Sequence, residues 1–169
     1  MKVTLFLCVS LDGFIATSDG SSAWPDGAYP NWCGFCSSCD NVVLGRVSYD
    51  GLIQNDFSDI LTAKHKVVVS SRDLNPPAET WTHMQTPAQA VEHLKACGIA
   101  NMVVGGGREL GVAFLRAGYI DEIMLDVQPV AFGTGVHLFG ALEKPLQLDL
   151  LEDKQLGRGA LRLRYGVHS

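Results

Sequence analysis

The sequence predicts an α/β fold in which a mostly parallel central sheet is flanked by helices and closed by antiparallel strands. The first observation is a set of four short apolar runs at residues 3–9, 41–44, 66–70 and 101–104. Such continuous runs are typical of parallel strands that are covered on both faces. The second observation is that longer strand-like segments follow near the C-terminus, at residues 120–130, 146–151 and 159–167. These segments are expected to complete the sheet.

Helical patterns lie between the apolar runs. The segment 86–98 has the best-marked ends, because Thr86 and Gln89 have the spacing of a capping box and Gly98 suits a left-handed stop. A second helix is predicted near 108–117, after a run of three glycines. Between the first two strands, residues 10–31 are rich in glycine, proline and small polar residues, which predicts a long loop.

The last strand shows a clear alternation. Leu161, Leu163 and Tyr165 alternate with Arg162 and Arg164. A period of two predicts a strand with one face toward the core and one face in water.

Length and composition bound the class of protein. The chain has 169 residues, of which 47% are apolar and 18% are charged. This predicts a single domain, residues 1–169, that is large enough to bury a sizeable core. The net charge of −5 argues against a nucleic-acid or anionic-membrane binder, which would need a basic face.

The same sequence indicates a cytoplasmic location. No apolar stretch reaches the roughly 18 residues that a membrane span needs, and the apolar run near Met1 leads into a loop rather than a signal-peptide cleavage site. The five cysteines are an odd number, which does not suit a framework of paired disulfides.

Three of the predicted strand ends carry residues that suit phosphate. Parallel strands bind ligands beyond their carboxyl ends, where glycine backbone, serine hydroxyls and arginine forks can contact an anion. The alternatives are a tight turn for the glycine run and surface ion pairs for single arginines. The glycines do not form a G-x-G-x-x-G fingerprint, since Gly111 falls one position late. The three segments are Gly45-Arg46, Ser70-Ser71-Arg72 and Gly105-Gly106-Gly107-Arg108.

Five segments together make a resemblance to a known family. The chain resembles the dihydrofolate reductase superfamily, and is closest to the C-terminal reductase domain of the bifunctional riboflavin-biosynthesis deaminase/reductase and its stand-alone relatives. The resemblance covers nearly the whole chain and implies a three-layer fold like that of dihydrofolate reductase. The segments are residues 10–16, 41–49, 67–72, 102–107 and 132–139.

The resemblance implies an NADPH-dependent reductase that transfers hydride to a C=N or C=O carbon of a small pteridine, pyrimidine or imine-type substrate. The nearest precedent is a ribosylaminopyrimidine phosphate, and a homodimer is also implied. The cofactor-binding residues carried over are Cys8, Ile15, Ala16, Gly45, Arg46, Ser48, Ser70, Ser71, Arg72, Gly105, Gly106, Gly107, Arg108 and Glu109. Ser71 and Arg72 match the pocket for the 2′-phosphate, which favours NADPH over NADH.

The resemblance also suggests where the substrate binds. Trp24 has the family's spacing from the first phosphate segment, and the helix near residues 29–39 should form one wall of the pocket. In that register the family's catalytic carboxylate falls on Tyr29, whose phenol cannot replace a carboxylate at neutral pH. Asp12 and Asp26 are the acidic alternatives, although an aspartate next to glycine is ordinarily a turn residue.

Cys33, Cys36 and Cys39 form a C-x-x-C-x-x-C run with three possible meanings. A tetrahedral zinc site would need a fourth ligand, and on a helix steps of three drift by about 60° each. We therefore expect Cys33 and Cys36 to line the substrate pocket, with no bound metal. Two other classes of function stay open: an NADPH-binding module without catalysis, and a cysteine-based metal or thiol-redox protein.

Overall fold

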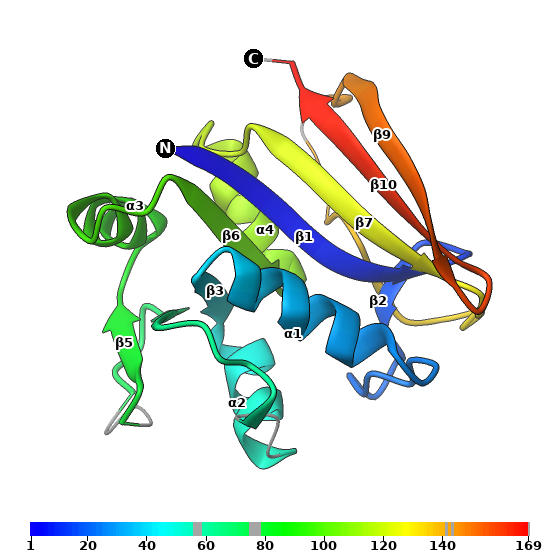
Figure 1. Ribbon diagram of the computed structural model, residues 1–169, viewed down its shortest axis with the longest axis horizontal. Coiled ribbons are helices and arrows are strands. Elements are labelled where there is room, and N and C mark those ends of the chain that lie inside the picture. The colour runs from blue at the N-terminus through cyan, green and yellow to red at the C-terminus, as the bar shows by residue number, and fades with distance from the viewer. Residues whose placement is uncertain (56–58, 75–78, 141, 143, 169) are drawn as a thin grey trace.

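The computed structural model describes residues 1–55, 59–74, 79–140, 142 and 144–168. It contains an eight-stranded sheet and a separate two-stranded sheet, with helices on both faces of the larger one (Figure 1). The helices are α1 (Ala28–Ser38), α2 (Arg46–Gln54), α3 (Pro87–Ala96) and α4 (Arg108–Arg116). The strands are β1 (Lys2–Ser10), β2 (Phe14–Ala16), β3 (Asn41–Gly45), β4 (His65–Val69), β5 (Trp81–Met84), β6 (Asn101–Gly106), β7 (Glu122–Gln128), β8 (Val136–His137), β9 (Leu148–Gly157) and β10 (Ala160–Val167).

The order of the large sheet is β5-β4-β3-β6-β1-β7-β10-β9. The first six strands in this order run parallel to their neighbours. β10 is antiparallel to β7 and to β9, so two antiparallel strands close one side of the sheet. The predicted fold class, mostly parallel with antiparallel closing strands and flanking helices, is confirmed.

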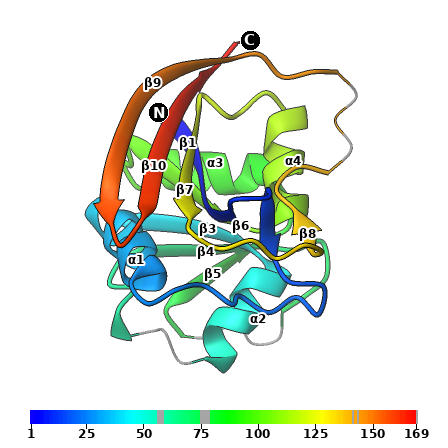
Figure 2. The ribbon, with the colours of Figure 1, turned by 90° about the vertical axis from the view of Figure 1, so that its right-hand side faces the viewer.

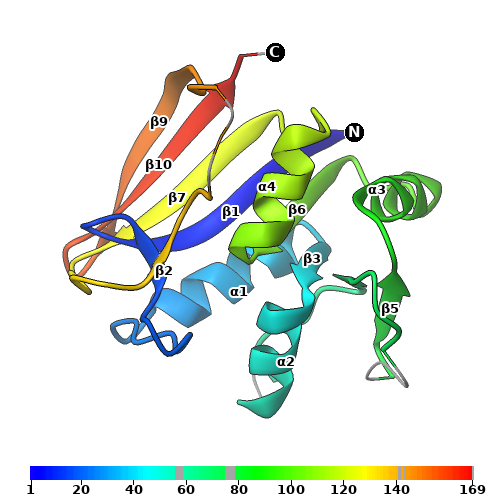
Figure 3. The same ribbon diagram turned by 180° about the vertical axis from the view of Figure 1, so that it is seen from behind.

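Two apolar clusters lie on opposite faces of the sheet. Leu5 of β1 packs with the buried side chains of α3 and α4 in one cluster, while the next residue, Phe6, packs with those of α1 and α2 in the other. This alternation is the period-two pattern of a strand that is covered on both faces. The resulting three layers can be followed from the front in Figure 1 and from behind in Figure 3.

The local sequence signals at both ends of α3 correctly predicted where this helix begins and ends. The Thr86 hydroxyl accepts a hydrogen bond from Gln89 N at 3.2 Å, and Gln89 Oε1 accepts one from Thr86 N at 3.2 Å, which completes the predicted capping box. Gly98 follows the helix with a φ of +78°, a conformation that glycine adopts without steric cost. The expected helix at 108–117 is observed as α4.

Three strands were not predicted. β2 and β8 are short and pair with each other across most of the chain's length, with Phe14 opposite His137 (Figure 2). β5 is an edge strand with one buried residue, Trp81. The predicted loop 10–31 was also too long, because it contains β2 and the start of α1. These elements depend on distant partners more than on their own pattern.

The wet face expected for β10 is wrong at Arg162. Arg162 donates two hydrogen bonds to the fully buried Asp126, from Nε to Oδ1 at 2.6 Å and from Nη2 to Oδ2 at 2.8 Å. Its guanidinium also lies 5.0 Å from the ring centre of Phe6 and 5.3 Å from that of Phe35. The Arg162 side chain therefore lies between β10 and α1, where it contacts a buried carboxylate and two aromatic rings.

In the part of the chain that the structure describes, no helix combines the length and the apolar character needed to cross a membrane.

Candidate active site

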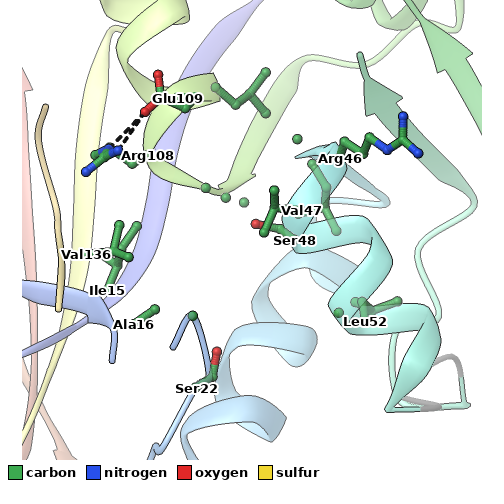
Figure 4. Close-up of a pocket in the computed structure, with 18 of the residues that line it drawn as sticks. Ile15, Ala16, Ser22, Arg46, Val47, Ser48, Leu52, Arg108, Glu109 and Val136 are labelled. Atoms are coloured by element: carbon green, nitrogen blue, oxygen red, sulfur yellow. Dashed lines mark hydrogen bonds and ion pairs between the residues drawn. The ribbon is translucent and has the colours of Figure 1, made fainter. Parts of the chain in front are cut away.

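A cavity of about 1050 Å³ opens at the carboxyl ends of four neighbouring parallel strands, β4, β3, β6 and β1. Parallel strands bring their carboxyl ends to the same edge, and that edge is where open α/β sheets bind ligands. Figure 4 shows α2 with Arg46 and Ser48 on one side, and Ile15, Ala16 and Val136 on the other. The cavity has two parts, which are named here after the ligands that the sequence predicts for them. The cofactor half surrounds the three phosphate-type segments, and the substrate half surrounds β1, β2 and α1.

The first segment of the cofactor half joins β3 to α2. Gly45 is the N-terminal cap residue of α2, and Arg46 and Ser48 occupy the first turn of the helix. Arg46 Nε lies 3.5 Å from Asp50 Oδ2 in an ion pair between exposed side chains, which contributes little to stability. The N-terminus of a helix beside a cation is a favourable place for an anion.

The second segment is the glycine run between β6 and α4. A Cβ on Gly105 would lie 2.6 Å from a ring carbon of Trp32 and 2.8 Å from a methyl of Val42, so only glycine fits there. Gly106 has a φ of +148°, and a Cβ on it would lie 3.1 Å from Ser48 Oγ. The first two segments are therefore packed directly against each other. Their close approach requires backbone without side chains.

The run ends at the N-terminus of α4. Arg108 pairs with its neighbour Glu109, with 2.9 Å from Nη2 to Oε1 and 3.0 Å from Nε to the same oxygen (Figure 4). Both side chains line the cavity and remain solvent-accessible. An anion at this helix end would meet the guanidinium together with the backbone N–H groups of the first turn.

The third segment follows β4. Ser70 Oγ accepts a hydrogen bond from Arg72 N at 3.1 Å and donates one to Arg72 O at 2.9 Å. The hydroxyl thus shapes a tight turn. Ser71 and Arg72 are exposed and line the cavity. Ser70 therefore shapes the turn that carries the other two residues.

The substrate half is mainly apolar and aromatic. Cys8 of β1, Trp24 of the following loop, and Tyr29 and Trp32 of α1 line it. Burial raises the pKa of Tyr29, while a hydrogen bond with Ser22 opposes this effect. The phenol is thus protonated at neutral pH and can donate a hydrogen bond.

Asp12 and Asp26 do not line this cavity. The Asp12 carboxylate accepts hydrogen bonds from Ser10 Oγ at 2.6 Å, Gly133 N at 2.7 Å and Phe132 N at 3.1 Å. The first of these is the main cause of the lowered pKa of Asp12. Asp26 lines a separate hollow of about 330 Å³ beside the β9–β10 turn. Of the three candidate catalytic residues, the structure brings only Tyr29 into the cavity.

The polar lining residues that the sequence analysis missed are Asp19, Ser21, Ser22, Gln54 and Asn55. Asp19 and Ser22 lie in the loop after β2 and line the cavity. Asp19 Oδ1 accepts hydrogen bonds from Thr17 Oγ1 at 2.6 Å and Ser21 N at 3.0 Å. The available signal was a small Asx-turn motif, an aspartate two residues before a serine. Such turns are common in loops and do not by themselves indicate a site.

The cysteines have mixed positions. Cys8 lines the cavity, whereas Cys33 and Cys36 are buried in the core of the α1 face and do not line it. Burial raises the pKa of Cys8 to about 12 and that of Cys33 to about 11, and it also raises the pKa of Cys36. These thiols are therefore protonated at neutral pH. Among the described residues, no group of three or more His, Cys, Asp and Glu side chains is arranged to hold a metal ion.

A family model and curated relatives both link this sequence to the same protein family. The family model of the RibD C-terminal domain matches residues 1–161. The uncharacterized protein YwjB of Bacillus subtilis is 34% identical, over 97% of this chain and 97% of its own. The riboflavin biosynthesis protein RibD of Mycobacterium tuberculosis is 30% identical over 78% of this chain. That match covers 43% of RibD, so this chain corresponds to less than half of the longer protein.

Solved structures show the same fold. RibD of Acinetobacter baumannii superposes with a TM-score of 0.76 and 23% sequence identity, over 99% of this chain and 58% of that chain. A pyrimidine reductase-like protein of Corynebacterium diphtheriae superposes with a TM-score of 0.73 and 13% identity, over 99% of this chain and 92% of that chain. At these identities the likeness establishes the architecture alone.

Proposed function

Because the chain belongs to the RibD C-terminal domain family, we propose that it is an NADPH-dependent reductase that transfers a hydride to the carbon of a C=N or C=O bond in a small heterocyclic substrate. One observation carries the proposal: three strand ends with glycine, serine and arginine converge on one cavity. A nucleotide with several phosphates needs this combination of bare backbone, hydroxyls and guanidinium groups. The rest of the cavity leaves room for a second, less polar ligand.

The residues of the cofactor half fit NADPH. The glycine run and the N-terminus of α4 suit a diphosphate, because Gly105 and Gly106 allow close approach of the backbone. Ser71 and Arg72 suit the 2′-phosphate, for which an arginine fork and a hydroxyl are typical partners. The bound cofactor supplies the hydride, and the protein supplies orientation and electrostatics.

The substrate half supports a flat unsaturated ligand next to the nicotinamide. Cys8, Ile15 and Ala16 line the wall that the nicotinamide would face. Tyr29 is the candidate proton donor, since it lines the cavity and its phenol is protonated at neutral pH. Trp24 provides an aromatic face against which a planar ring can stack. Cys33 and Cys36 support this half from the core of α1.

A titration of tryptophan fluorescence with NADPH and with NADH tests the cofactor assignment. Trp24 and Trp32 line the cavity, so we expect quenching and tighter binding of NADPH. The double variant Ser71→Ala, Arg72→Ala should weaken NADPH about ten- to hundredfold and leave NADH nearly unchanged, because hydrogen bonds to a charged group contribute roughly 1.5–3 kcal/mol. Equal loss for both cofactors would contradict the 2′-phosphate role.

Arg158→Ala is a matched control, because Arg158 lines the separate hollow beside the β9–β10 turn. It should leave both affinities unchanged. NADPH binding without oxidation by any carbonyl, imine or dihydropteridine would support the alternative of a binding module without catalysis. No binding of either nucleotide would refute the reductase proposal.

The homodimer implied by the resemblance also remains a proposal. β9 is the outermost strand on its side of the sheet, and it exposes Leu150 and Leu151. Apolar side chains on an open edge strand support pairing with a second copy of the chain.

A further inference from the structure

The cations along the cavity are unevenly distributed. Arg46, Arg72 and Arg108 are the basic residues among the described lining residues, and all three belong to the cofactor half. The described lining of the substrate half contains no Lys, Arg or His. The ten positions outside the described ranges contain no basic residue either. The basic residues of the described lining therefore all follow the three phosphate-type segments.

Asp19 gives the substrate half a fixed negative charge. It lies in the loop between Ala16 and Ser22, both of which face the cavity in Figure 4. The hydrogen bonds from Thr17 Oγ1 and Ser21 N hold the pKa of Asp19 at about 2. The carboxylate is therefore ionised throughout the physiological pH range, and no described cation on the lining of this half compensates it.

Two basic residues on elements next to the substrate half, Arg162 of β10 and His137 of β8, have other partners. Arg162 lies close enough to Cys8 to influence its pKa, but its Nε and Nη2 both donate hydrogen bonds to the carboxylate of Asp126. The His137 ring packs against Phe14, with 4.5 Å between ring centres. Neither residue lines the cavity. An anionic group on a substrate would consequently meet Asp19 without a compensating cation.

A phosphate monoester carries between one and a half and two negative charges at pH 7 and is usually held by arginine or lysine. We infer that the substrate is a planar, uncharged or cationic compound that carries no phosphate. This inference rests on the proposed reductase function and narrows its substrate class. It separates this chain from the ribosylaminopyrimidine phosphate that the family resemblance implies, because only the cofactor half of the cavity is equipped for phosphate.

The reaction balances for both kinds of substrate. With an uncharged carbonyl or imine, the carbon gains the hydride, the π-electron pair moves to oxygen or nitrogen, and that atom takes a proton from Tyr29 or solvent. With a cationic iminium, the hydride alone gives the neutral amine, and no proton donor is needed. In each case NADPH leaves as NADP⁺. Asp19 favours the cationic form in the ground state.

The test compares one ribosylaminopyrimidine with and without its 5′-phosphate. Each is titrated into the NADP⁺-loaded protein at low salt, and tryptophan fluorescence gives the dissociation constant without turnover. We expect the unphosphorylated compound to bind at least as tightly as the phosphate, and the phosphate to be several-fold weaker. Binding of the phosphate tenfold tighter than the unphosphorylated compound would overturn the inference.

Charge reversal sharpens the result. Asp19→Lys should strengthen binding of the phosphorylated compound at least tenfold relative to wild type. The affinity of Asp19→Asn for this compound should lie between those of wild type and Asp19→Lys. Asp153→Lys is the matched control, because Asp153 is an exposed residue of β9 that does not line the cavity. If Asp19→Lys and Asp153→Lys have the same effect, Asp19 does not act on the substrate and the inference is wrong.

If neither compound binds, the inference about substrate charge is tested by measuring NADPH oxidation instead. The protein is assayed with carbonyl and imine compounds in pairs that differ by a phosphate or carboxylate group. Turnover of the uncharged or cationic members supports the inference, and turnover confined to the anionic members overturns it. Turnover of no compound refutes the proposed function and this inference together. NADPH binding, measured beforehand, separates that outcome from the loss of the cofactor site.

Discussion

The two halves of the cavity are built in different ways. Each segment of the cofactor half comes directly after a buried parallel strand, so its residues are neighbours in the sequence as well as in space. The substrate half takes Cys8 from a strand, Asp19 and Trp24 from a loop, and Tyr29 and Trp32 from a helix. Its shape depends on how those elements pack. The first half is a local feature of the chain, and the second is a product of tertiary structure.

The two halves also differ in whether backbone or side chains determine their shape. The cofactor half depends on glycines that allow two backbone segments to meet, and on arginines at the rim. The substrate half depends on the volume and polarity of interior side chains. A change of substrate therefore needs only new side chains on β1, α1 and the intervening loop, while the cofactor half stays intact. The comparison predicts that variants of the two halves can be distinguished by experiment.

The largest effect, a loss of folding stability, is expected from breaking the buried ion pair between Arg162 and Asp126. Arg162→Leu leaves the Asp126 carboxylate buried without its partner, and breaking a buried ion pair in this way costs about 3–5 kcal/mol. Urea unfolding should show this loss. NADPH affinity, measured at a temperature where the variant is folded, should stay within about threefold of wild type.

The double variant Asp126→Leu, Arg162→Leu is the control, because removal of both charges should recover most of the lost stability. A single variant as stable as wild type would contradict the buried pair. A strong loss of NADPH affinity in the folded single variant would contradict the independence of the two halves.

Gly105→Ala tests a position where the two halves meet, because Gly105 of the glycine run packs against Trp32 of α1. The new Cβ would clash with Trp32 and Val42, and such overpacking typically costs about 1–3 kcal/mol. Since Trp32 lines the cavity, both cofactor and substrate binding should weaken. Gly34→Ala is the control: Gly34 is an exposed residue of α1, and a Cβ there would meet nothing within 4 Å. It should be neutral or slightly stabilising. Equal stability of both variants would contradict the close packing at Gly105.

The parts that could be predicted from the sequence are those with local physical causes. The capping box of Thr86 and Gln89 fixed the start of α3, and Gly98 marked its end. The buried parallel strands were visible as apolar runs, and the polar residues after them indicated the phosphate-type segments. The resemblance to a family then placed these segments in one site.

The parts that could not be predicted depend on contacts between distant residues. Arg162 looked like a solvent-facing residue because nothing nearby in the sequence reveals Asp126 opposite it. Asp12 looked like a candidate acid, and its partners Phe132 and Gly133 lie about 120 positions away. Cys33 and Cys36 were placed near the substrate, whereas the rotation of α1 about its axis turns them into the core. The sequence pattern did not reveal the rotation of α1 about its axis or the pairing of β10 with β7, and these determine where the side chains lie.

Asp12→Asn tests whether this carboxylate works in catalysis or in holding loops together. The hydrogen bonds from Ser10, Phe132 and Gly133 lower the pKa of Asp12, so its stabilising effect is present above the ordinary pKa and is lost as the pH falls through the lowered one. We expect a lower Tm at pH 7, a smaller difference from wild type near pH 3, and little change in turnover once an assay exists. Lost turnover with an unchanged Tm would establish a catalytic role instead.

The smallest effect is expected from the buried thiols, which also tests the redox alternative. In the folded protein the pKa of Cys33 rises from 9.0 to about 11 because of burial. Above pH 9 the unfolded chain loses the thiol proton while the folded protein retains it, so stability that is complete below pH 8 declines as the pH rises toward 11.

The Cys33→Ala variant has no thiol at this position, so this thiol no longer lowers its stability at high pH. Between pH 8 and pH 10, its free energy of unfolding should therefore fall by about 1 kcal/mol less than that of wild type. Cys97→Ala, at an exposed position, should follow wild type. Parallel pH profiles for wild type and Cys33→Ala would mean that this thiol ionises as readily in the folded protein as in the unfolded chain. Such a reactive thiol would return the cysteines of α1 to consideration as a redox site.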